Sequence, residues 1–412
     1  MSTEGPRMTT ADPRFEHRTA NAVLTVLGAD GSPLAGTEVT VAQKRHAFSF
    51  GCTPPSTDPE RAGERRLWLD LFDTATLQFY WGRFEPERGT TEREAVLAEA
   101  RELDAEGVRL KGHPLVWHYV KPEWLDELPL EEAEELLRAR IRREVGDFAG
   151  LVDTWDAINE VVIMPRFENE PDGVRNAVTR LSERKGRVAM VELAVSEARA
   201  GGTEPFLVLN DFDLGPEYER LIEDVLSAGV RIDAIGLQSH MHQGFRGEEQ
   251  ITEICDRFAR FGLPLHWTET TLVSGDLMPA EIEDLNDHVV EDWPTTPEGE
   301  ARQADEMVRH YSTLVAHPAV QAITYWGFDD AGAWLGAPGG FVRRDGSPKP
   351  AYDALRSLVR GQWWLEPTVL RTDEEGRVGV SAFAGDFEVS AGGERATVSL
   401  AAGPAEATVR LA

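Results

Sequence analysis

Short apolar runs alternate with longer amphipathic stretches along most of the chain. Eight runs have the length and composition of buried strands, at residues 46–52, 76–81, 109–116, 152–160, 206–211, 234–240, 263–270 and 322–328. Segments between them, such as 131–145, 188–200 and 301–316, carry apolar residues three and four positions apart, as helices do. Strands that each precede a helix favour an α/β fold, a (β/α)8 TIM barrel over residues 45–362, rather than an open doubly wound sheet.

The two ends of the chain have a different pattern, in which apolar and polar residues alternate over short runs. Residues 21–43 predict two strands around a turn at 30–33, and residues 363–412 predict short strands separated by glycine-containing turns. Neither end has enough strands to bury a sheet face alone. We therefore expect residues 21–44 and 363–412 to pair into one small accessory β-sandwich. Residues 1–20 are polar and are expected to form a tail.

The composition and the net charge indicate which classes of binding partner the protein can have. The chain has 412 residues, 41% of them hydrophobic, enough for one large domain and a modest addition. Asp and Glu number 72 against 42 Lys and Arg, a formal net charge of −30 that would repel nucleic acid and anionic lipids. No apolar run approaches the ~20 residues that cross a bilayer. We expect neither nucleic acid nor membrane as a partner, whereas a neutral ligand such as a sugar fits the charge.

Other features bear on cofactors and location. Cys52 and Cys255 have no metal-binding spacing and are expected to be free, buried thiols. The sequence contains no glycine-rich phosphate loop, so it predicts no nucleotide site and no cofactor. The amino-terminal residues lack the apolar core of a secretory signal, which favours a cytoplasmic protein over a secreted form whose signal has been removed. The sequence carries no signal of oligomeric state.

Polar and aromatic residues gather where predicted barrel strands end. The residues in question are His113, Trp117, His118, Asn159, Glu160, Gln238, His240, His242, Glu269 and Trp326. Because the carboxyl ends of barrel strands form one rim, these side chains are expected to converge on one site. The loops at 161–185 and 271–298 are long enough to overhang this rim and to set specificity.

Two of these residues, Glu160 and Glu269, suggest a chemistry. A protonated and an ionised carboxyl group that face each other ~5 to 5.5 Å apart hydrolyse glycosidic bonds with retention of configuration. Mutual repulsion raises the pKa of one of them. Asn159, Gln238 and His240 are suited to bond a sugar hydroxyl or the nucleophile. The side chains of Trp117, Trp326 and Trp334 offer apolar faces to a sugar ring, whereas Trp267 is expected in the core.

The ordered motifs resemble those of the family 10 glycoside hydrolases, retaining endo-β-1,4-xylanases built on a (β/α)8 barrel. The resemblance runs from about residue 46 to residue 362. The motifs are Lys111-Gly-His-Pro-Leu-Val-Trp-His118, Trp155-Asp-Ala-Ile-Asn-Glu160, Gly236-Leu-Gln-Ser-His240, Trp267-Thr-Glu269 and Ile323-Thr-Tyr-Trp-Gly-Phe-Asp-Asp330, the last followed by Trp334.

The resemblance implies a role for each matching residue. It implies Glu160 as general acid/base and Glu269 as nucleophile. Asn159 would bond the sugar 2-hydroxyl, and Gln238 and His240 would support Glu269. His113 would bond the sugar next to the scissile bond, inside walls formed by Trp326 and Trp334.

One departure from the family pattern bears on the substrate. Leu77 and Tyr80 stand where the family usually has an Asn and a Lys that hold sugars on the non-reducing side of the cut. We therefore expect a divergent member that acts on xylo-oligosaccharides or a short β-glycoside rather than on polymeric xylan.

Two alternative functions remain open. A metal-dependent barrel hydrolase could draw its ligands from His113, His118, His240, His242 and Asp329. A non-catalytic carbohydrate-binding barrel is the other alternative, although both carboxylates and their polar neighbours are present.

Overall fold

The computed structural model describes residues 12–55, 61–168 and 173–412, and a closed eight-stranded barrel forms its centre. The strands are β3 (Ser49–Cys52), β4 (Thr74–Gln78), β5 (Arg109–His113), β6 (Val152–Asn159), β7 (Phe206–Asp211), β8 (Ala234–Met241), β9 (Leu265–Leu272) and β10 (Val320–Tyr325). All neighbouring pairs are parallel, and β10 closes the ring on β3. The predicted (β/α)8 barrel is confirmed.

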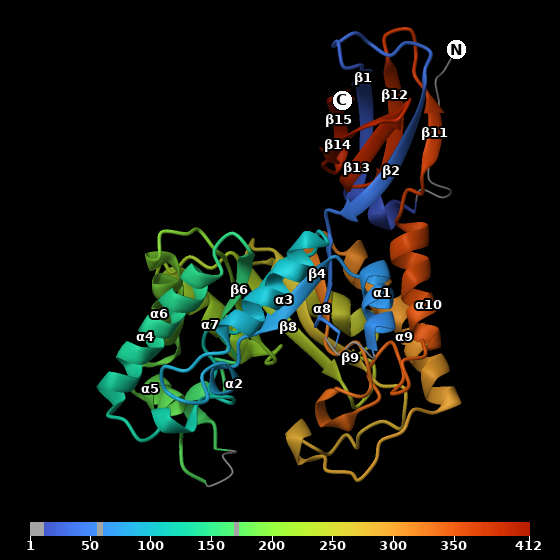
Figure 1. Ribbon diagram of the computed structural model, residues 1–412. Coiled ribbons are helices and arrows are strands. Elements are labelled where there is room, and N and C mark those ends of the chain that lie inside the picture. Colours follow the sequence, from blue (N-terminus) through green and yellow to red (C-terminus); the bar gives the residue numbers. More distant parts are fainter. Residues whose placement is uncertain (1–11, 56–60, 169–172) are drawn as a thin grey trace.

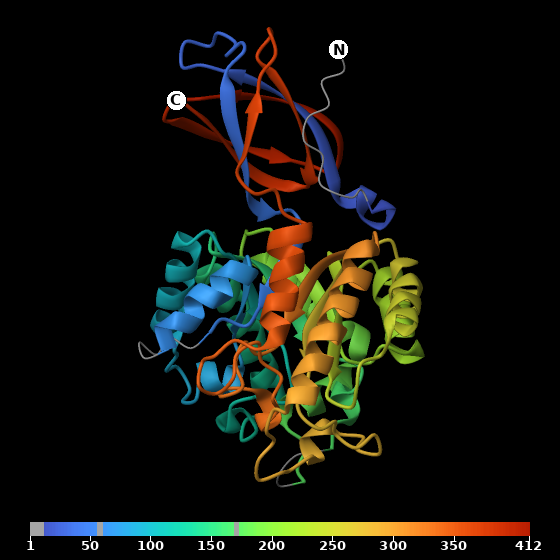
Figure 2. The same ribbon diagram turned by 90° about the vertical axis from the view of Figure 1, so that its right-hand side faces the viewer.

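Helices surround the barrel (Figures 1 and 2). They are α1 (Ala62–Leu71), α2 (Trp81–Phe84), α3 (Arg93–Ala105), α4 (Leu130–Asp147), α5 (Ala177–Lys185), α6 (Arg187–Ala200), α7 (Pro216–Ser227), α8 (Glu248–Ala259), α9 (Pro297–Ala316) and α10 (Pro350–Ser357). Helix α4 shows why the pattern predicted them, because Ala133, Leu137, Ile141 and Val145 recur every four residues and are all buried.

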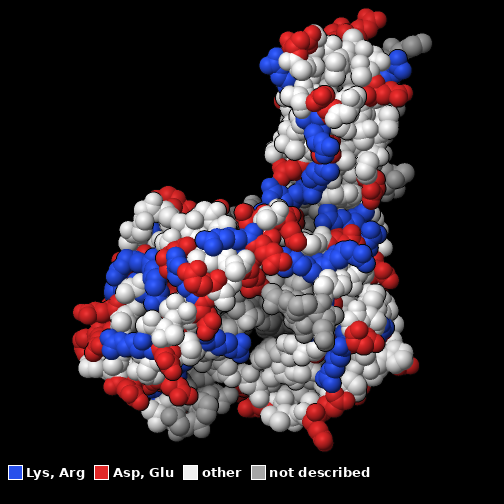
Figure 3. All heavy atoms as spheres, in the orientation of Figure 1, with Lys and Arg blue, Asp and Glu red and all other residues white. Residues whose placement is uncertain are grey.

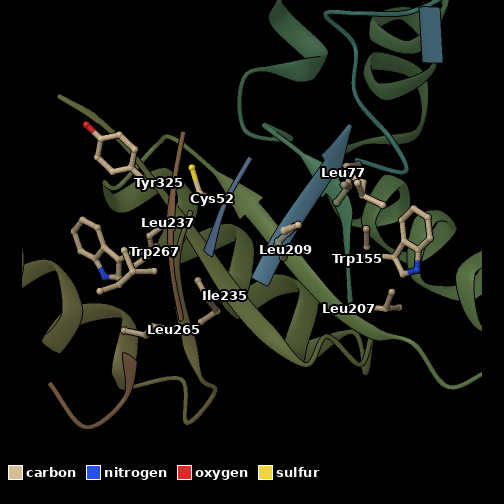
Figure 4. Close-up of a cluster of buried hydrophobic side chains, with 14 of the residues drawn as sticks. Cys52, Leu77, Trp155, Leu207, Leu209, Ile235, Leu237, Leu265, Trp267 and Tyr325 are labelled. Carbon is tan, nitrogen blue, oxygen red and sulfur yellow. The ribbon is translucent and has the colours of Figure 1, made fainter. Parts of the chain in front are cut away.

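The barrel core is formed by side chains from all around the ring (Figure 4). On β5, Gly112 is required for this packing, since a Cβ atom there would lie 2.2 Å from the Trp155 ring. Trp267 is fully buried, as expected of a core residue. Leu77 also belongs to the core and is only 1% exposed, so its side chain is not available to a ligand.

The two ends of the chain form one sandwich of two sheets. One sheet has the order β12 (Arg377–Phe383), β1 (Thr19–Leu27), β15 (Gly403–Arg410), and the other has the order β11 (Thr368–Arg371), β2 (Glu38–His46), β13 (Gly385–Ala391), β14 (Glu394–Leu400). Both amino-terminal strands lie between carboxyl-terminal strands, and Leu24, Val26, Val41 and Phe387 fill the space between the sheets. The predicted accessory sandwich from both termini is confirmed.

Several predicted boundaries were wrong. Residues 13–20 are not a polar tail: Pro13–Arg18 form the 3-10 helix η1 and β1 begins at Thr19, whereas residues 1–11 of that prediction lie outside the described residues. His46 ends β2 instead of opening the first barrel strand. Its ring bonds the Val359 carbonyl oxygen at 2.9 Å, which fixes it at the junction of the two domains.

Two further segments differ from prediction near the rim. Trp81 begins α2 instead of ending β4, because its side chain packs against Trp124 and its indole nitrogen donates to Glu85. The loop predicted at 161–185 is shorter, since Asn176 caps α5 by accepting a hydrogen bond from the Thr179 backbone nitrogen.

The sandwich is attached to the end of the barrel where the strands begin. Phe15 of η1 packs against Trp363, with ring centroids 5.5 Å apart. Arg18 donates hydrogen bonds to three backbone carbonyls, those of Val315, His317 and Val320, between α9 and β10. Figure 1 shows the sandwich on one side of the barrel and the loops that follow the strands on the opposite side.

Two other findings concern the whole described chain. Cys52 and Cys255 are buried free thiols, as predicted. Within residues 12–55, 61–168 and 173–412, none of the helices combines the length and apolar character needed to cross a membrane.

Candidate active site

The two predicted catalytic carboxylates share an unusual backbone conformation. Glu160, directly after β6, and Glu269, in β9, both have φ of +56°, and among the described residues the remaining non-glycine residue with positive φ is Leu335. Such a conformation costs of order 1–3 kcal/mol and collects at functional sites. At Glu269 the cause is a bulge: Gln238 pairs with Thr268 but His240 pairs with Thr271, so the β9 strand holds one extra residue.

A chain of hydrogen bonds links the two carboxylates. Asn159 Nδ2 donates to Glu160 Oε1 at 3.1 Å. Asn210, the next-to-last residue of β7, donates from Nδ2 to Asn159 Oδ1 at 2.7 Å and to Glu269 Oε1 at 2.8 Å. The side chains therefore lie close together at the mouth of the barrel, as glycoside hydrolysis by a pair of carboxyl groups requires.

Each carboxylate has further partners of its own. Trp117 Nε1 donates to Glu160 Oε2 at 2.8 Å, and Gln238 Nε2 donates to Glu160 Oε1 at 3.1 Å. His240 Nε2 lies 3.3 Å from Glu269 Oε2. Both oxygens of Glu160 and both of Glu269 are thus held by neighbouring side chains, which fixes their orientation.

Next to Glu269 lies a row of buried polar side chains. His113 Nε2 is 3.9 Å from Glu269 Oε1, and His113 Nδ1 is 2.7 Å from Asp156 Oδ2. Lys111 Nζ pairs with the other oxygen of Asp156 at 2.8 Å. The Asp156 carboxylate orients the His113 ring, and Lys111 compensates the buried charge of Asp156.

The surroundings separate the pKa values of the two carboxyl groups. Burial, together with the charge of Glu269, raises the pKa of Glu160 to about 7. Burial also acts to raise the pKa of Glu269, but the charge of His113 and the hydrogen bond with His240 outweigh it and hold that pKa below its ordinary value. Near pH 6 Glu160 is protonated while Glu269 is ionised, which are the states of an acid and a nucleophile.

Aromatic side chains surround the carboxylates. The Trp326 ring lies 5.0 Å from that of His113, and the Trp334 ring lies 4.8 Å from that of His240. Trp334 is 37% exposed, so part of its face is free. Tyr80 packs its ring 5.3 Å from Trp117. These rings provide apolar walls of the kind that pack against sugars.

His118, also expected at the rim, is buried against Phe167 instead, but the structure brings ten other residues predicted for the site into one neighbourhood. They are Tyr80, His113, Trp117, Asn159, Glu160, Gln238, His240, Glu269, Trp326 and Trp334. One implied contact differs, because Gln238 bonds Asn159 and Glu160 instead of supporting Glu269. The cause is its place on β8, where it faces the end of β6.

Sequence reasoning missed three residues that position this site. Asn210 joins the carboxylates, and Asp156 holds His113. Asp211 is fully buried and accepts a hydrogen bond from the Val162 backbone nitrogen, which fixes the turn after Glu160. Burial raises the pKa of Asp211 to about 7. The predicted strand 206–211 ended in Asn210 and Asp211, so the strand-end rule applied to it would have found both.

Two of the histidines suggested as metal ligands contact other side chains of the protein. His240 has both ring nitrogens engaged, Nδ1 with Thr271 and Nε2 with Glu269. His118 is buried with its ring against Phe167, 4.5 Å between centroids. In the part of the chain that the structure describes, no three His, Cys, Asp or Glu side chains are arranged to hold a metal ion.

Comparisons with known proteins agree with this geometry. The model of Glycosyl hydrolase family 10 matches residues 74–358. Endo-1,4-beta-xylanase B of Thermotoga neapolitana is 26% identical over 298 residues, 68% of this chain and 78% of that protein. Anti-sigma-I factor RsgI6 of Acetivibrio thermocellus is 23% identical over 392 residues, 91% of this chain but 45% of its own length.

Solved structures show the same fold. A family 10 structure from Paenibacillus barcinonensis superposes with a TM-score of 0.63 at 23% identity and covers 76% of this chain and 96% of the other. Xylanase 10B of Thermotoga maritima gives a TM-score of 0.60 at 21% identity, with 76% and 95% covered. Several longer curated relatives are spanned only in part, for example 28% of endo-1,4-beta-xylanase C of Paenibacillus barcinonensis.

Proposed function

The chain belongs to glycosyl hydrolase family 10, and from this premise we propose that it cleaves β-glycosidic bonds by double displacement, with Glu269 as nucleophile and Glu160 as general acid/base. The observation that carries the proposal is the pair of carboxyl groups joined through Asn159 and Asn210, with pKa values moved in opposite directions.

In the first step the ionised Glu269 attacks the anomeric carbon while Glu160 donates its proton to the leaving glycosidic oxygen. The C–O bond to the leaving group breaks, and an ester between the sugar and Glu269 forms through an oxocarbenium-like transition state. The Trp117 indole and the Gln238 amide aim the Glu160 carboxyl group, and Asn210 and His240 aim that of Glu269.

In the second step Glu160 acts as the general base instead of the general acid. Formation of the ester removes the negative charge of Glu269, which is one cause of the raised pKa of Glu160. The pKa of Glu160 therefore falls, and its carboxylate can accept a proton from the water that attacks the anomeric carbon. Hydrolysis releases a sugar of retained configuration and restores the protonated Glu160.

We propose xylo-oligosaccharides or a short β-glycoside as substrates. A neutral sugar suits the cleavage point, since the ionised Glu269 disfavours an anion there. Of the two departures from the family pattern, Leu77 lies in the core, whereas the Tyr80 ring packs beside Trp117 and His113. The substitution at Tyr80 is thus the one placed to change which sugar is held.

The test is hydrolysis of an aryl β-xyloside, xylo-oligosaccharides of increasing length and polymeric xylan, with the product anomer followed by NMR. We expect the β-anomer to form first from short substrates, and Glu269→Gln to abolish turnover. Glu291→Gln, on an exposed loop, is the matched control and keeps its activity. First formation of the α-anomer would exclude retention, and efficient release of oligomers from xylan would contradict the short-substrate proposal.

A sugar-binding protein without turnover is the second candidate. It is favoured by Leu77 and Tyr80, which replace two polar residues of the family pattern that hold sugars. The same assay separates the two functions, because a binding protein would hold xylo-oligosaccharides without cleaving them.

A further inference from the structure

Three polar side chains at the end of β4 and on the segment that follows it have no hydrogen-bond or ion-pair partner among the described residues. They are the amide of Gln78, the hydroxyl of Tyr80 and the guanidinium group of Arg83. Gln78 is the last residue of β4 and is exposed, on the strand face opposite to the buried Leu77. Tyr80 is only 9% exposed, so its free hydroxyl belongs to a largely buried side chain.

The exposed guanidinium group of Arg83 has no ion-pair partner among the described residues, although it lies close to other charged groups. Exposed arginines nearby form ion pairs, Arg88 with Glu132 at 2.8 Å and Arg93 with Asp147 at 2.7 Å. Figure 3 shows basic side chains lying among acidic ones on the visible face of the molecule. Arg83 instead lies over the ring of Tyr80, 5.2 Å from its centroid, and leaves its N–H groups available. A guanidinium group binds a carboxylate through two parallel hydrogen bonds.

This group adjoins the catalytic pair. The Tyr80 ring is 5.3 Å from Trp117, which bonds Glu160, and 5.8 Å from His113, which lies beside Glu269. Burial raises the pKa of the Tyr80 hydroxyl, the charge of Glu269 raises it further and the charge of Arg83 opposes the rise. The hydroxyl therefore lies within electrostatic range of both the nucleophile and the free cation.

We propose that Gln78, Tyr80 and Arg83 form a subsite for a sugar that carries a carboxylate, a uronic acid linked to the neutral sugar that is cleaved. Arg83 binds the carboxylate, and Tyr80 and Gln78 bond ring hydroxyls. The carboxylate belongs at this end because the ionised Glu269 repels an anion at the cleavage point. This inference rests on the proposed function and adds to it the class of the neighbouring sugar.

Binding is the decisive test, made in the Glu269→Gln background so that the ligand is not consumed. Calorimetry compares a xylo-oligosaccharide with one of the same length that bears a glucuronic acid substituent. We expect the acidic ligand to bind about tenfold more tightly, as a charge-assisted contact allows. This preference should weaken as salt rises to 0.5 M, since salt screens an exposed charge pair.

Arg83→Gln identifies the residue responsible, and Arg101→Gln is its matched control. Arg101 is exposed on α3 and likewise has no ion pair among the described residues. We expect Arg83→Gln to remove the preference and Arg101→Gln to retain it. Equal binding of the two ligands, or a preference that survives Arg83→Gln, overturns the inference. Hydrolysis of the unsubstituted oligosaccharide by the unaltered chain tests the proposed function separately.

Discussion

Glu160 and Glu269 are chemically identical side chains, and their surroundings give them opposite tasks. The backbone at both residues is strained, and their oxygens are held by Trp117, Asn159, Asn210, Gln238 and His240. A site held in this way has little freedom to reorganise during the reaction, which is how an enzyme lowers the cost of developing charge.

The pH dependence of kcat/KM follows from these surroundings. Glu160 must be protonated, so activity should fall as pH rises through about 7. Glu269 must be ionised, and because its pKa lies below the ordinary 4.5, activity should persist at pH 5 and fall only in more acidic solution. The measurement is kcat/KM from pH 3 to pH 9. A basic limb near pH 5 would show that Glu160 is not the acid.

Replacement of the acid should depend on the leaving group. We expect Glu160→Gln to lower kcat by roughly 10²- to 10⁴-fold for xylo-oligosaccharides and far less for an activated aryl glycoside. Activated leaving groups depart without protonation, so the basic limb of their pH profile should also disappear. Equal losses on both kinds of substrate would contradict the acid/base role.

Asn210 is predicted to position both carboxylates. Asn210→Ala removes the donor to Glu269 Oε1 and to Asn159 Oδ1, and we expect kcat/KM to fall roughly ten- to hundredfold. Loss of a hydrogen bond to an ionised carboxylate raises its pKa, so the acid limb should move to higher pH. The control is Asn176→Ala, a buried asparagine that caps α5 and should leave the acid limb in place.

For single residues, the sequence predicted the members of the candidate site but not all of the side chains to which they hydrogen-bond. Strand-end positions and ordered motifs found the carboxylates and the aromatic walls. The contact of Gln238 with Glu160 depends on the relative stagger of β6 and β8, which no local pattern encodes. Asn210 and Asp211 carried the same strand-end signal as Glu160 and were overlooked because they match no separate motif.

Among the elements, the barrel strands were the most predictable. Parallel strands buried on both faces give continuous apolar runs, and β7 was predicted at the residues where the structure has it. The predicted ends of the strands were wrong where contacts with residues distant in the sequence determine the end of an element. His46 lies at the domain junction, and Trp81 is drawn into α2 by its contacts with Trp124 and Glu85.

The 3-10 helix η1 is predicted to hold the two domains together. Arg18 donates to three carbonyls at the junction of α9 and β10, and its removal leaves them without that partner. We expect Arg18→Gln to lower the free energy of unfolding by about 1–3 kcal/mol, measured by chemical denaturation. Arg14→Gln on the same element removes an exposed pair with Asp12 and a cation–π contact with Phe15, and it should have a much smaller effect. Equal effects of the two changes would show that η1 has no such role.

At the scale of the whole molecule, the sandwich lies at one end of the barrel and the loops that follow the strands lie at the other (Figure 1). Glu160 follows β6 directly, so the candidate site is on the side away from the sandwich. The pairing of the chain ends was predictable because each end lacked strands to cover its apolar face. The sheet order was not, since it places β1 between β12 and β15 and thus depends on long-range pairing.

This separation predicts that sandwich stability and catalysis can be changed independently. Phe387 is fully buried between the sheets, and Phe387→Ala should destabilise the sandwich by about 3–5 kcal/mol. The folded variant should keep its kcat, measured well below the unfolding transition. Val369→Ala, at a position 64% exposed on β11, is the control and should unfold like the unaltered protein. A large loss of kcat in folded Phe387→Ala would show that the sandwich acts on the site.

The central claim is that Glu269 forms a covalent bond to the sugar while Glu160 handles the proton. The most direct measurement is inactivation with an activated 2-deoxy-2-fluoro β-xylobioside, which slows hydrolysis of the glycosyl ester, followed by mass spectrometry of the digested protein. The account predicts one added 2-deoxy-2-fluoroxylobiosyl group on the peptide that contains Glu269, and none in Glu269→Gln. A label on the peptide of Glu160, or turnover of ordinary substrate with inversion and no label, would contradict it.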